Sequence, residues 1–142
     1  LPEFCQKHKK YERMGLRDLC QHVHTLYAKY DIARLTTDMY LSDLTPAMKP
    51  SDAYAQIARR NTERVSVDAL EGRITTSLLT PYPPGIPLLV PGEVFNKKIV
   101  DYLKFAREFN LQCPGFETDI HGMVEEVGDD GVKRYFADCV KT

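Results

Sequence analysis

The sequence lacks an excess of charge of either sign, because 19 Lys and Arg residues face 20 Asp and Glu residues. A chain so balanced has no electrostatic attraction for nucleic acid or an anionic membrane. It also lacks an apolar run near the ~20 residues that a membrane helix needs. Its first residues, LPEFCQKHKKYER, do not show the charged-then-apolar pattern of a signal peptide. These absences predict a soluble, cytoplasmic protein with no nucleic-acid or membrane partner.

The sequence contains four cysteines, and none of them forms a CxxC pair: Cys5, Cys20, Cys113 and Cys139. Their spacing matches no zinc module. We therefore expect free, reduced and partly buried thiols, and no metal site. Cys20, His22 and His24 form a Cys-x-His-x-His pattern, but on a helix His22 would point away from the other two.

The chain has 142 residues and shows no internal repeat or low-complexity tract. This length corresponds to one domain, and a chain that is 43% hydrophobic can bury a core without metal or disulfide staples. Because the first residue is Leu1 rather than Met, we expect the sequence to be cut from something longer.

Several segments carry the 3.6-residue apolar period of amphipathic helices. We expect helices over residues 16–30, 31–41, 50–61 and 96–111, and one short turn over 67–70 that stops at Gly72. Strands are expected where β-branched and apolar residues lie between turn residues: 73–80, 86–90, and the hairpin arms 118–127 and 132–141 around Asp130-Gly131. The order predicts an α+β domain, with a small, mainly antiparallel sheet and helices packed against it.

The segment TPYPPGIPLLVPGE, residues 80–93, is the most unusual stretch. Proline has no backbone N–H and a fixed φ, so Pro81 to Pro87 cannot form an interior strand. Gly85 is the permissive hinge of this stretch. The result is a stiff loop with Tyr82 near one end and Glu93 at the other.

Two interpretations of this loop are open. It can be a rigid connector that packs on the core, with Glu93 in the first turn of the following helix, where a carboxylate favours the helix dipole. Alternatively it is the rim of a binding cavity. Tyr82 would then form an aromatic wall, and Glu93 would offer a carboxylate to a cationic ligand.

Two long motifs suggest a family. GRITTSLLTPYPPGIPLLVPGE, followed by a helix and then PGFETDIHG at residues 114–122, resembles the C-terminal domain of bacterial Orn/Lys/Arg decarboxylases. These are large enzymes of pyridoxal phosphate (PLP) fold type I. GLRDLCQHVH is more loosely similar to the family's N-terminal helix, so the resemblance extends over nearly all 142 residues.

The resemblance implies that residues 1–142 form a single C-terminal domain of a larger polypeptide. The family's wing domain and PLP-binding domain would lie outside this sequence, and the catalytic lysine belongs to a Ser-x-His-Lys motif in the PLP-binding domain. The nearest match here, QKHK, begins with Gln6 instead of serine and lies in a polar run. A Schiff-base lysine needs desolvation or a charged neighbour, so we interpret Lys9 as a surface residue. The fragment is therefore expected to hold neither a catalytic residue nor the cofactor, and to be inactive alone.

The whole enzyme would convert lysine, arginine or ornithine to a diamine or agmatine, with release of CO2 and uptake of a proton. This reaction serves polyamine synthesis and acid resistance. The implied partners are the PLP-binding domain of the same polypeptide, further copies in a homo-oligomer, and the basic amino acid. Tyr82, Glu93 and His121 are the candidates for the substrate entrance, and His121 is also a candidate for a subunit contact.

Two questions are left open by the sequence. One is which of the three amino acids is the substrate. The other is whether the chain is instead a freestanding, non-catalytic binding or assembly module of the same fold.

Near His121, Glu117 and Asp119 alternate along the expected strand, so both could face a basic neighbour.

Overall fold

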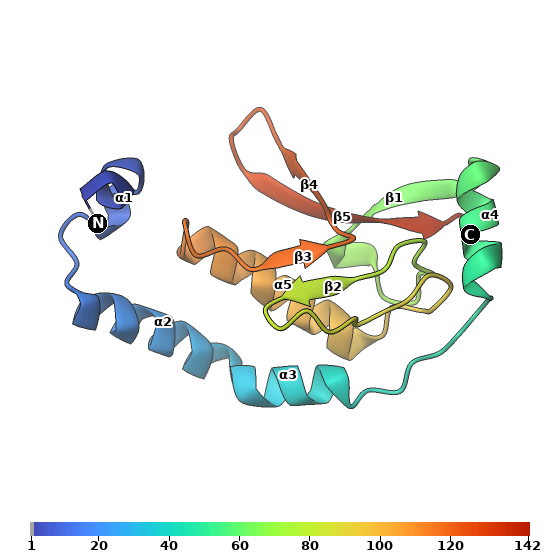
Figure 1. Cartoon of the computed structure of the whole chain (residues 1–142), viewed down its shortest axis with the longest axis horizontal. Coiled ribbons are helices and arrows are strands. Elements are labelled where there is room, and N and C mark those ends of the chain that lie inside the picture. Colours follow the sequence, from blue (N-terminus) through green and yellow to red (C-terminus); the bar gives the residue numbers. More distant parts are fainter. Residues whose placement is uncertain (1) are drawn as a thin grey trace.

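A long helix and two small antiparallel sheets form the centre of the protein, in a computed structural model that describes residues 2–142. The helices are α1 (Pro2–Lys7), α2 (Leu16–Tyr30), α3 (Ile32–Tyr40), α4 (Pro50–Ala58) and α5 (Lys97–Gln112). The strands are β1 (Thr62–Ser66), β2 (Thr80–Tyr82), β3 (Asp119–His121), β4 (Val124–Val127) and β5 (Lys133–Val140). Short 3-10 helices span Lys9–Tyr11 and Val67–Ala69. The strands lie over α5, while α2 and α3 follow one another along the opposite side (Figure 1).

Asp31 separates the first two long helices. It adopts a left-handed conformation, with φ of 47° and ψ of 56°, and is at once the C-cap of α2 and the N-cap of α3. Aspartate tolerates this conformation better than most residues. The helices predicted over 16–30 and 31–41 are therefore confirmed, and one residue sets the bend between them.

The helix α5 carries the core. Asn96 caps its start, because its side-chain Oδ1 accepts a hydrogen bond from the backbone N–H of Ile99 at 2.9 Å. The buried side of α5 faces the leucines of the loops around it. This core includes Leu70, Leu79, Leu89, Phe95, Ile99, Leu103, Phe105 and Phe109. The helix predicted over 96–111 is confirmed, and the structure adds Asn96 as its N-cap.

Both sheets are antiparallel, which confirms the α+β class. One sheet has the strand order β1-β5-β4, and the other pairs β2 with β3. In the smaller sheet Pro81 lies opposite Ile120, and Tyr82 lies opposite Asp119. Pro81 thus occupies a strand at a sheet edge, where its missing N–H is tolerated.

The expected helix over 50–61 begins as predicted at Pro50 but ends at Ala58. Arg60 has a φ of 56°, which stops the helix. The chain then enters β1, a strand that the sequence analysis missed. Its pairing with β5 along the whole of Thr62–Ser66 is a contact between segments far apart in sequence, and periodicity does not report such contacts. The short turn expected at 67–70 is present as Val67–Ala69.

The strand expected over 73–80 is wrong except at its last residue, Thr80. Ile74 and Thr75 make only isolated bridges, to Val94 and Cys139. Thr75 is fully buried, and its hydroxyl donates to the carbonyl oxygen of Ser77 at 2.9 Å. This local bond competes with a regular ladder.

The strand expected over 86–90 is also absent, since the chain makes only one isolated bridge there, between Leu79 and Leu89. The second hairpin arm, 132–141, is confirmed as β5, but the first arm is two strands in different sheets. The chain turns between them at Gly122, where φ is 91° and a Cβ would collide with the carbonyl oxygen of Leu78. Only glycine fits this close approach.

Candidate functional site

The proline-rich loop is anchored at its base by three leucines. The backbone N–H of Leu79 donates to the carbonyl oxygen of Leu89 at 2.9 Å, and the N–H of Leu88 donates back to Leu79 at 2.8 Å. Leu79 and Leu89 are fully buried. The Tyr82–Pro83 and Pro83–Pro84 peptide bonds of the loop are cis. Hydrophobic burial thus holds the base while the tip, with Tyr82, stays exposed.

Tyr82, Asp119 and His121 meet on the outer face of the β2–β3 sheet. The ring centroids of Tyr82 and His121 are 4.6 Å apart at an interplanar angle of 48°. His121 Nε2 lies 3.0 Å from Asp119 Oδ2. Both side chains of this pair are mostly exposed, and the Tyr82 residue is 48% exposed. The structure therefore brings together two of the three predicted site residues, with an aspartate as their neighbour.

Glu93 lies at the base of the loop instead. Its Oε2 accepts a hydrogen bond from the backbone N–H of Val90 at 2.8 Å, and its backbone carbonyl accepts from Thr75 at 3.0 Å. Glu93 is half-buried and is not in the first turn of α5, which begins at Lys97. Its carboxylate therefore closes a turn, and its position differs from that of Tyr82 and His121.

A cavity of about 140 Å³ lies behind the loop, between α3, α5 and the two cis-linked prolines. Pro83, Pro84 and Thr118 form one wall, and tyrosines from three helices form much of the rest: Tyr27, Tyr40 and Tyr102. Burial raises the pKa of Tyr102 to about 12, with smaller contributions from Tyr40 and Tyr27. Burial also raises the pKa of Tyr40, whose hydroxyl has no hydrogen-bond partner within residues 2–142. Pro83 and Pro84 thus face the helices across this cavity.

A second feature is an apolar groove along α2. One hollow of about 340 Å³ is lined by Leu19, Cys20, Val23, His24, Tyr27 and Phe116. An adjoining hollow of about 180 Å³ shares Leu19 and Phe116 and extends over Phe4, Tyr11, Met14 and Leu16. We call these two hollows the α2 groove. Leu16 is 78% exposed and Phe116 is 44% exposed, so large apolar side chains here face water.

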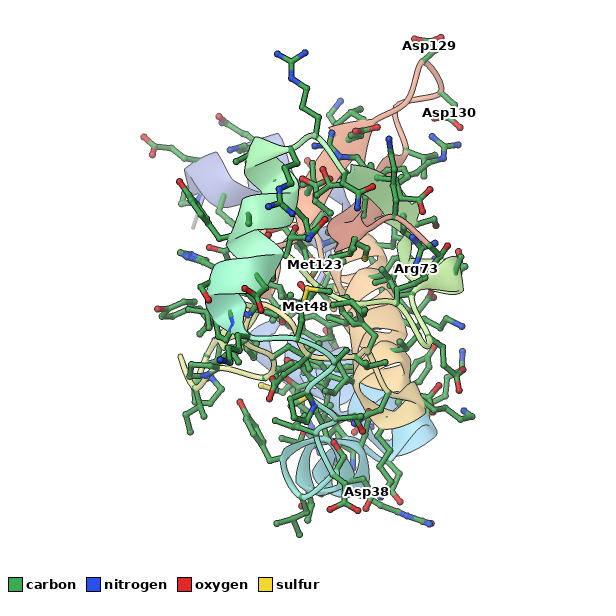
Figure 2. All side chains as sticks on the ribbon, turned by 90° about the vertical axis from the view of Figure 1, so that its right-hand side faces the viewer. Asp38, Met48, Arg73, Met123, Asp129 and Asp130 are labelled. Atoms are coloured by element: carbon green, nitrogen blue, oxygen red, sulfur yellow. The ribbon has the colours of Figure 1, made fainter. Side chains whose placement is uncertain are left out.

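Ionic contacts are spread over the surface and do not converge on a site. Arg64 bridges Glu126 at 2.7 Å and Asp138 at 3.1 Å on the outer face of the larger sheet. Asp130 pairs with Arg134 at 2.7 Å. Figure 2 shows Asp129 and Asp130 projecting at one end of the molecule and Asp38 at the other. Surface pairs of this kind contribute little to stability.

The burial of the lysines and the arrangement of metal-ligating side chains decide whether this chain can hold PLP or a metal ion. Within residues 2–142, no lysine is buried: Lys104 is half-buried and the others, Lys9 included, are exposed. No group of three or more His, Cys, Asp or Glu side chains in the same residues is arranged to hold a metal ion. None of the helices in this part of the chain combines the length and the apolar character that a bilayer span requires.

The sequence does not predict that Asp119 lies beside Tyr82 and His121, and it does not predict the α2 groove. From the sequence, Asp119 is predicted only to lie on a strand and to face a basic neighbour. Its opposition to Tyr82 depends on which strand β3 pairs with. The exposed apolar side of α2 was visible in the sequence as periodicity, which does not tell a covered face from an uncovered one.

Comparisons with known proteins agree on one family. The model described as "Orn/Lys/Arg decarboxylase, C-terminal domain" matches residues 33–141. Lysine decarboxylase LdcA of Pseudomonas aeruginosa is 43% identical over 136 residues, covering 94% of this chain and 18% of that protein. The constitutive ornithine decarboxylase of Escherichia coli is 35% identical over 144 residues, covering 99% of this chain and 20% of that protein.

Solved structures give the same result. Lysine decarboxylase A from Pseudomonas aeruginosa matches with a TM-score of 0.87 at 42% identity, over 96% of this chain and 18% of that one. The E. coli constitutive lysine decarboxylase matches with a TM-score of 0.86 at 31% identity, over 99% of this chain and 20% of that one. The chain thus spans about a fifth of the length of these relatives.

Proposed function

The chain belongs to the Orn/Lys/Arg decarboxylase C-terminal domain family, and from this premise we propose that it forms the C-terminal domain of a PLP-dependent decarboxylase of basic amino acids. The observation that carries the proposal is a 43% identity that extends over 94% of this chain and only 18% of LdcA. The reaction would release CO2 from lysine, arginine or ornithine and take up a proton, leaving a diamine or agmatine. The names of the two relatives support lysine and ornithine first. A cytoplasmic location remains a prediction.

The residues of this chain do not fit PLP. A lysine that forms a Schiff base needs desolvation or a charged neighbour, and Lys9 is exposed in a 3-10 turn near the N-terminus. Lys104 is only half-buried, and its position on α5 lies within a helix rather than after a strand. We therefore assign the cofactor to the PLP-binding domain of the same polypeptide, and derive no step of the reaction from this chain.

The α2 groove supports the proposal that this domain packs against another domain of a longer polypeptide. Exposed apolar patches of this kind mark surfaces that bind another protein part, and the relatives offer about four-fifths of their length outside the match. We assign the groove to the PLP-binding domain of the same polypeptide. Leu16 and Leu19 lie on its α2 wall, so a substitution of either would weaken the contact. Homo-oligomers would then be assembled from whole polypeptides.

The proline-rich loop would form part of the substrate entrance. Its tip is exposed and stiff, and it is backed by α3 and α5. A loop that is already ordered loses little conformational entropy when it meets a ligand. Tyr82, Glu93 and His121 are the proposed entrance residues, with Glu93 acting at the base of the loop.

The test is an assay of CO2 release by the polypeptide that contains this chain, loaded with PLP, on lysine, ornithine and arginine in turn. We expect activity on at least one of them, and none from residues 1–142 alone. Leu16→Gln should lower the activity of the long form by weakening the α2 contact and leave the thermal stability of the isolated domain unchanged.

Two outcomes would contradict the proposal. One is a long form that decarboxylates none of the three amino acids. The other is a gene that encodes only this domain, behind its own start codon, which favours the freestanding binding or assembly module.

A further inference from the structure

We infer that Asp119, rather than Glu93, supplies the carboxylate that meets the cationic end of the substrate at the entrance. Tyr82 and His121 would form the other two walls of this position. The inference rests on the proposed function and changes the assignment of one residue within it.

The β2–β3 register brings these side chains together. Tyr82 and Asp119 are directly opposite one another, and so are Thr80 and His121. Side chains of opposed residues lie on the same face of a sheet, and neighbours along a strand alternate. Pro81 and Ile120 therefore point to the other face, where Pro81 is fully buried and Ile120 packs on the core. The buried pair keeps the outer face in register.

The contact with His121 leaves one carboxylate oxygen of Asp119 free. An ionised carboxylate can only accept hydrogen bonds, so His121 donates from Nε2 to Asp119 Oδ2, which is 3.0 Å away. Within residues 2–142, Asp119 Oδ1 has no hydrogen-bond partner, and no Lys or Arg pairs with Asp119.

The carboxylate of Asp119 and the aromatic ring of Tyr82 both attract a cation. The Asp119 carboxylate carries a negative charge, and its Oδ1 has no hydrogen-bond partner within residues 2–142. The face of an aromatic ring also attracts ammonium and guanidinium groups. Lysine, ornithine and arginine all end in such a group, and a carboxylate binds it through charge-assisted hydrogen bonds.

Glu93 differs from Asp119 in its hydrogen bonds, its exposure and its position along the loop. Its Oε2 already accepts the N–H of Val90 at 2.8 Å, and the residue is half-buried. Its backbone bonds to Thr75, whereas Tyr82 lies beyond the Leu79–Leu89 bridge, toward the tip of the loop. Glu93 and Tyr82 are therefore on opposite sides of the buried leucine pair.

The test compares two variants of the PLP-loaded long polypeptide, Asp119→Asn and Glu93→Gln, by KM and kcat for its best substrate. We expect Asp119→Asn to raise KM about fivefold to tenfold, with kcat changed less than twofold, because an interaction made equally in the ground and transition states is lost. The matched control is Asp129→Asn, an exposed aspartate at the far tip of the β4–β5 turn (Figure 2), which should leave KM unchanged.

A second readout separates charge recognition from a loss of structure. The wild-type KM should rise with ionic strength, because salt screens the attraction between carboxylate and cation, and this dependence should flatten in Asp119→Asn alone. Asp119→Glu, which keeps the charge, should restore most of the affinity.

The outcomes distinguish the inference from the proposed function. An active wild type whose KM is unaffected by Asp119→Asn, or is raised by Glu93→Gln alone, overturns the inference and leaves the decarboxylase assignment intact. A wild type without decarboxylase activity overturns both.

Discussion

The side-chain amide of Asn110 on α5 binds the backbone of Thr118 in both directions. Asn110 Oδ1 accepts the Thr118 N–H at 2.8 Å, and Asn110 Nδ2 donates to the Thr118 carbonyl oxygen at 3.1 Å. The same Nδ2 lies 3.1 Å from the hydroxyl oxygen of Tyr135, to which it donates. Asn110 thus connects the main helix to the segment that leads directly into β3. The position of Asp119 and His121 therefore depends on a buried residue that never contacts them.

Replacement of Asn110 should destabilise the whole domain. Asn110→Ala leaves the backbone groups of Thr118 and the hydroxyl of Tyr135 without their partner, and unpaired buried polar groups are costly. We expect a loss of about 2–3 kcal/mol in the free energy of unfolding, measured with urea. Asn61→Ala is the control, because Asn61 is exposed and bonds only to Gln56 through its side chain. Equal losses in both variants would show that the network is not special.

Gly122 should tolerate no side chain. Gly122→Ala and Gly131→Ala both place an L-residue at positive φ, which costs about 1–2 kcal/mol. Gly131 has a φ of 74° and open space around it, whereas a Cβ on Gly122 would meet the carbonyl oxygen of Leu78. We expect Gly122→Ala to lose at least about 1 kcal/mol more than Gly131→Ala in urea unfolding. A smaller loss at Gly122 would mean that β3 can shift without penalty.

Three of the four cysteines should differ clearly in reactivity. Cys20 is exposed, while Cys113 and Cys139 are buried. Burial raises the pKa of both buried thiols, that of Cys139 to about 11, so little thiolate is present near neutral pH. With a maleimide and mass spectrometry, we expect rapid labelling of Cys20 and labelling of Cys113 and Cys139 only on unfolding. Cys20→Ser should abolish this rapid maleimide labelling. Fast labelling of Cys139 in the folded domain would be incompatible with this arrangement.

Asp130 should make stability depend on pH in the acid range. Hydrogen bonds from Arg134 and from the backbone of Val132 lower its pKa from 3.8 to about 2. A carboxylate with a lowered pKa stabilises the fold fully above its unfolded-state pKa, and that contribution is lost as the pH falls through the folded-state value. The advantage of the wild type over Asp130→Asn should therefore shrink between about pH 4 and about pH 2. Asp129→Asn is the control, and a carboxyl titration of Asp130 by NMR with a midpoint near 4 would contradict the assignment.

The four longer helices could be predicted from the sequence because their signals are local, whereas α1 (Pro2–Lys7) was not predicted. The apolar period of 16–30 and of 96–111 each follows from a few turns of chain, and Asn96 and Pro50 mark starts. Helix ends were less certain, since Arg60 in the left-handed region is not an expected stop. The strand predictions failed where a side chain bonds to a distant residue or to a near neighbour in the sequence. Thr76, for instance, donates its hydroxyl to the carbonyl oxygen of Asp138 at 2.7 Å.

The candidate site was half predictable for the same reason. The prolines of residues 81–87 and the two family motifs pointed to Tyr82, Glu93 and His121, because stiffness and motif spacing are properties of short segments. Which carboxylate lies beside the aromatic rings could not be predicted. The answer depends on the pairing of β2 with β3, segments almost forty positions apart in the chain.

The sequence alone determined the four longer helices, the rigid loop, the absence of a large net charge and the family. Each of these is encoded by neighbouring residues through backbone restriction, side-chain period or composition. Only the tertiary structure decided that β3 and β4 belong to different sheets and that β3 pairs with β2. It also decided that the Glu93 carboxylate accepts a hydrogen bond from Val90 and that His121 lies within hydrogen-bond distance of Asp119. These outcomes depend on hydrogen bonds and burial shared between distant segments, and such contacts exist only once the chain has folded.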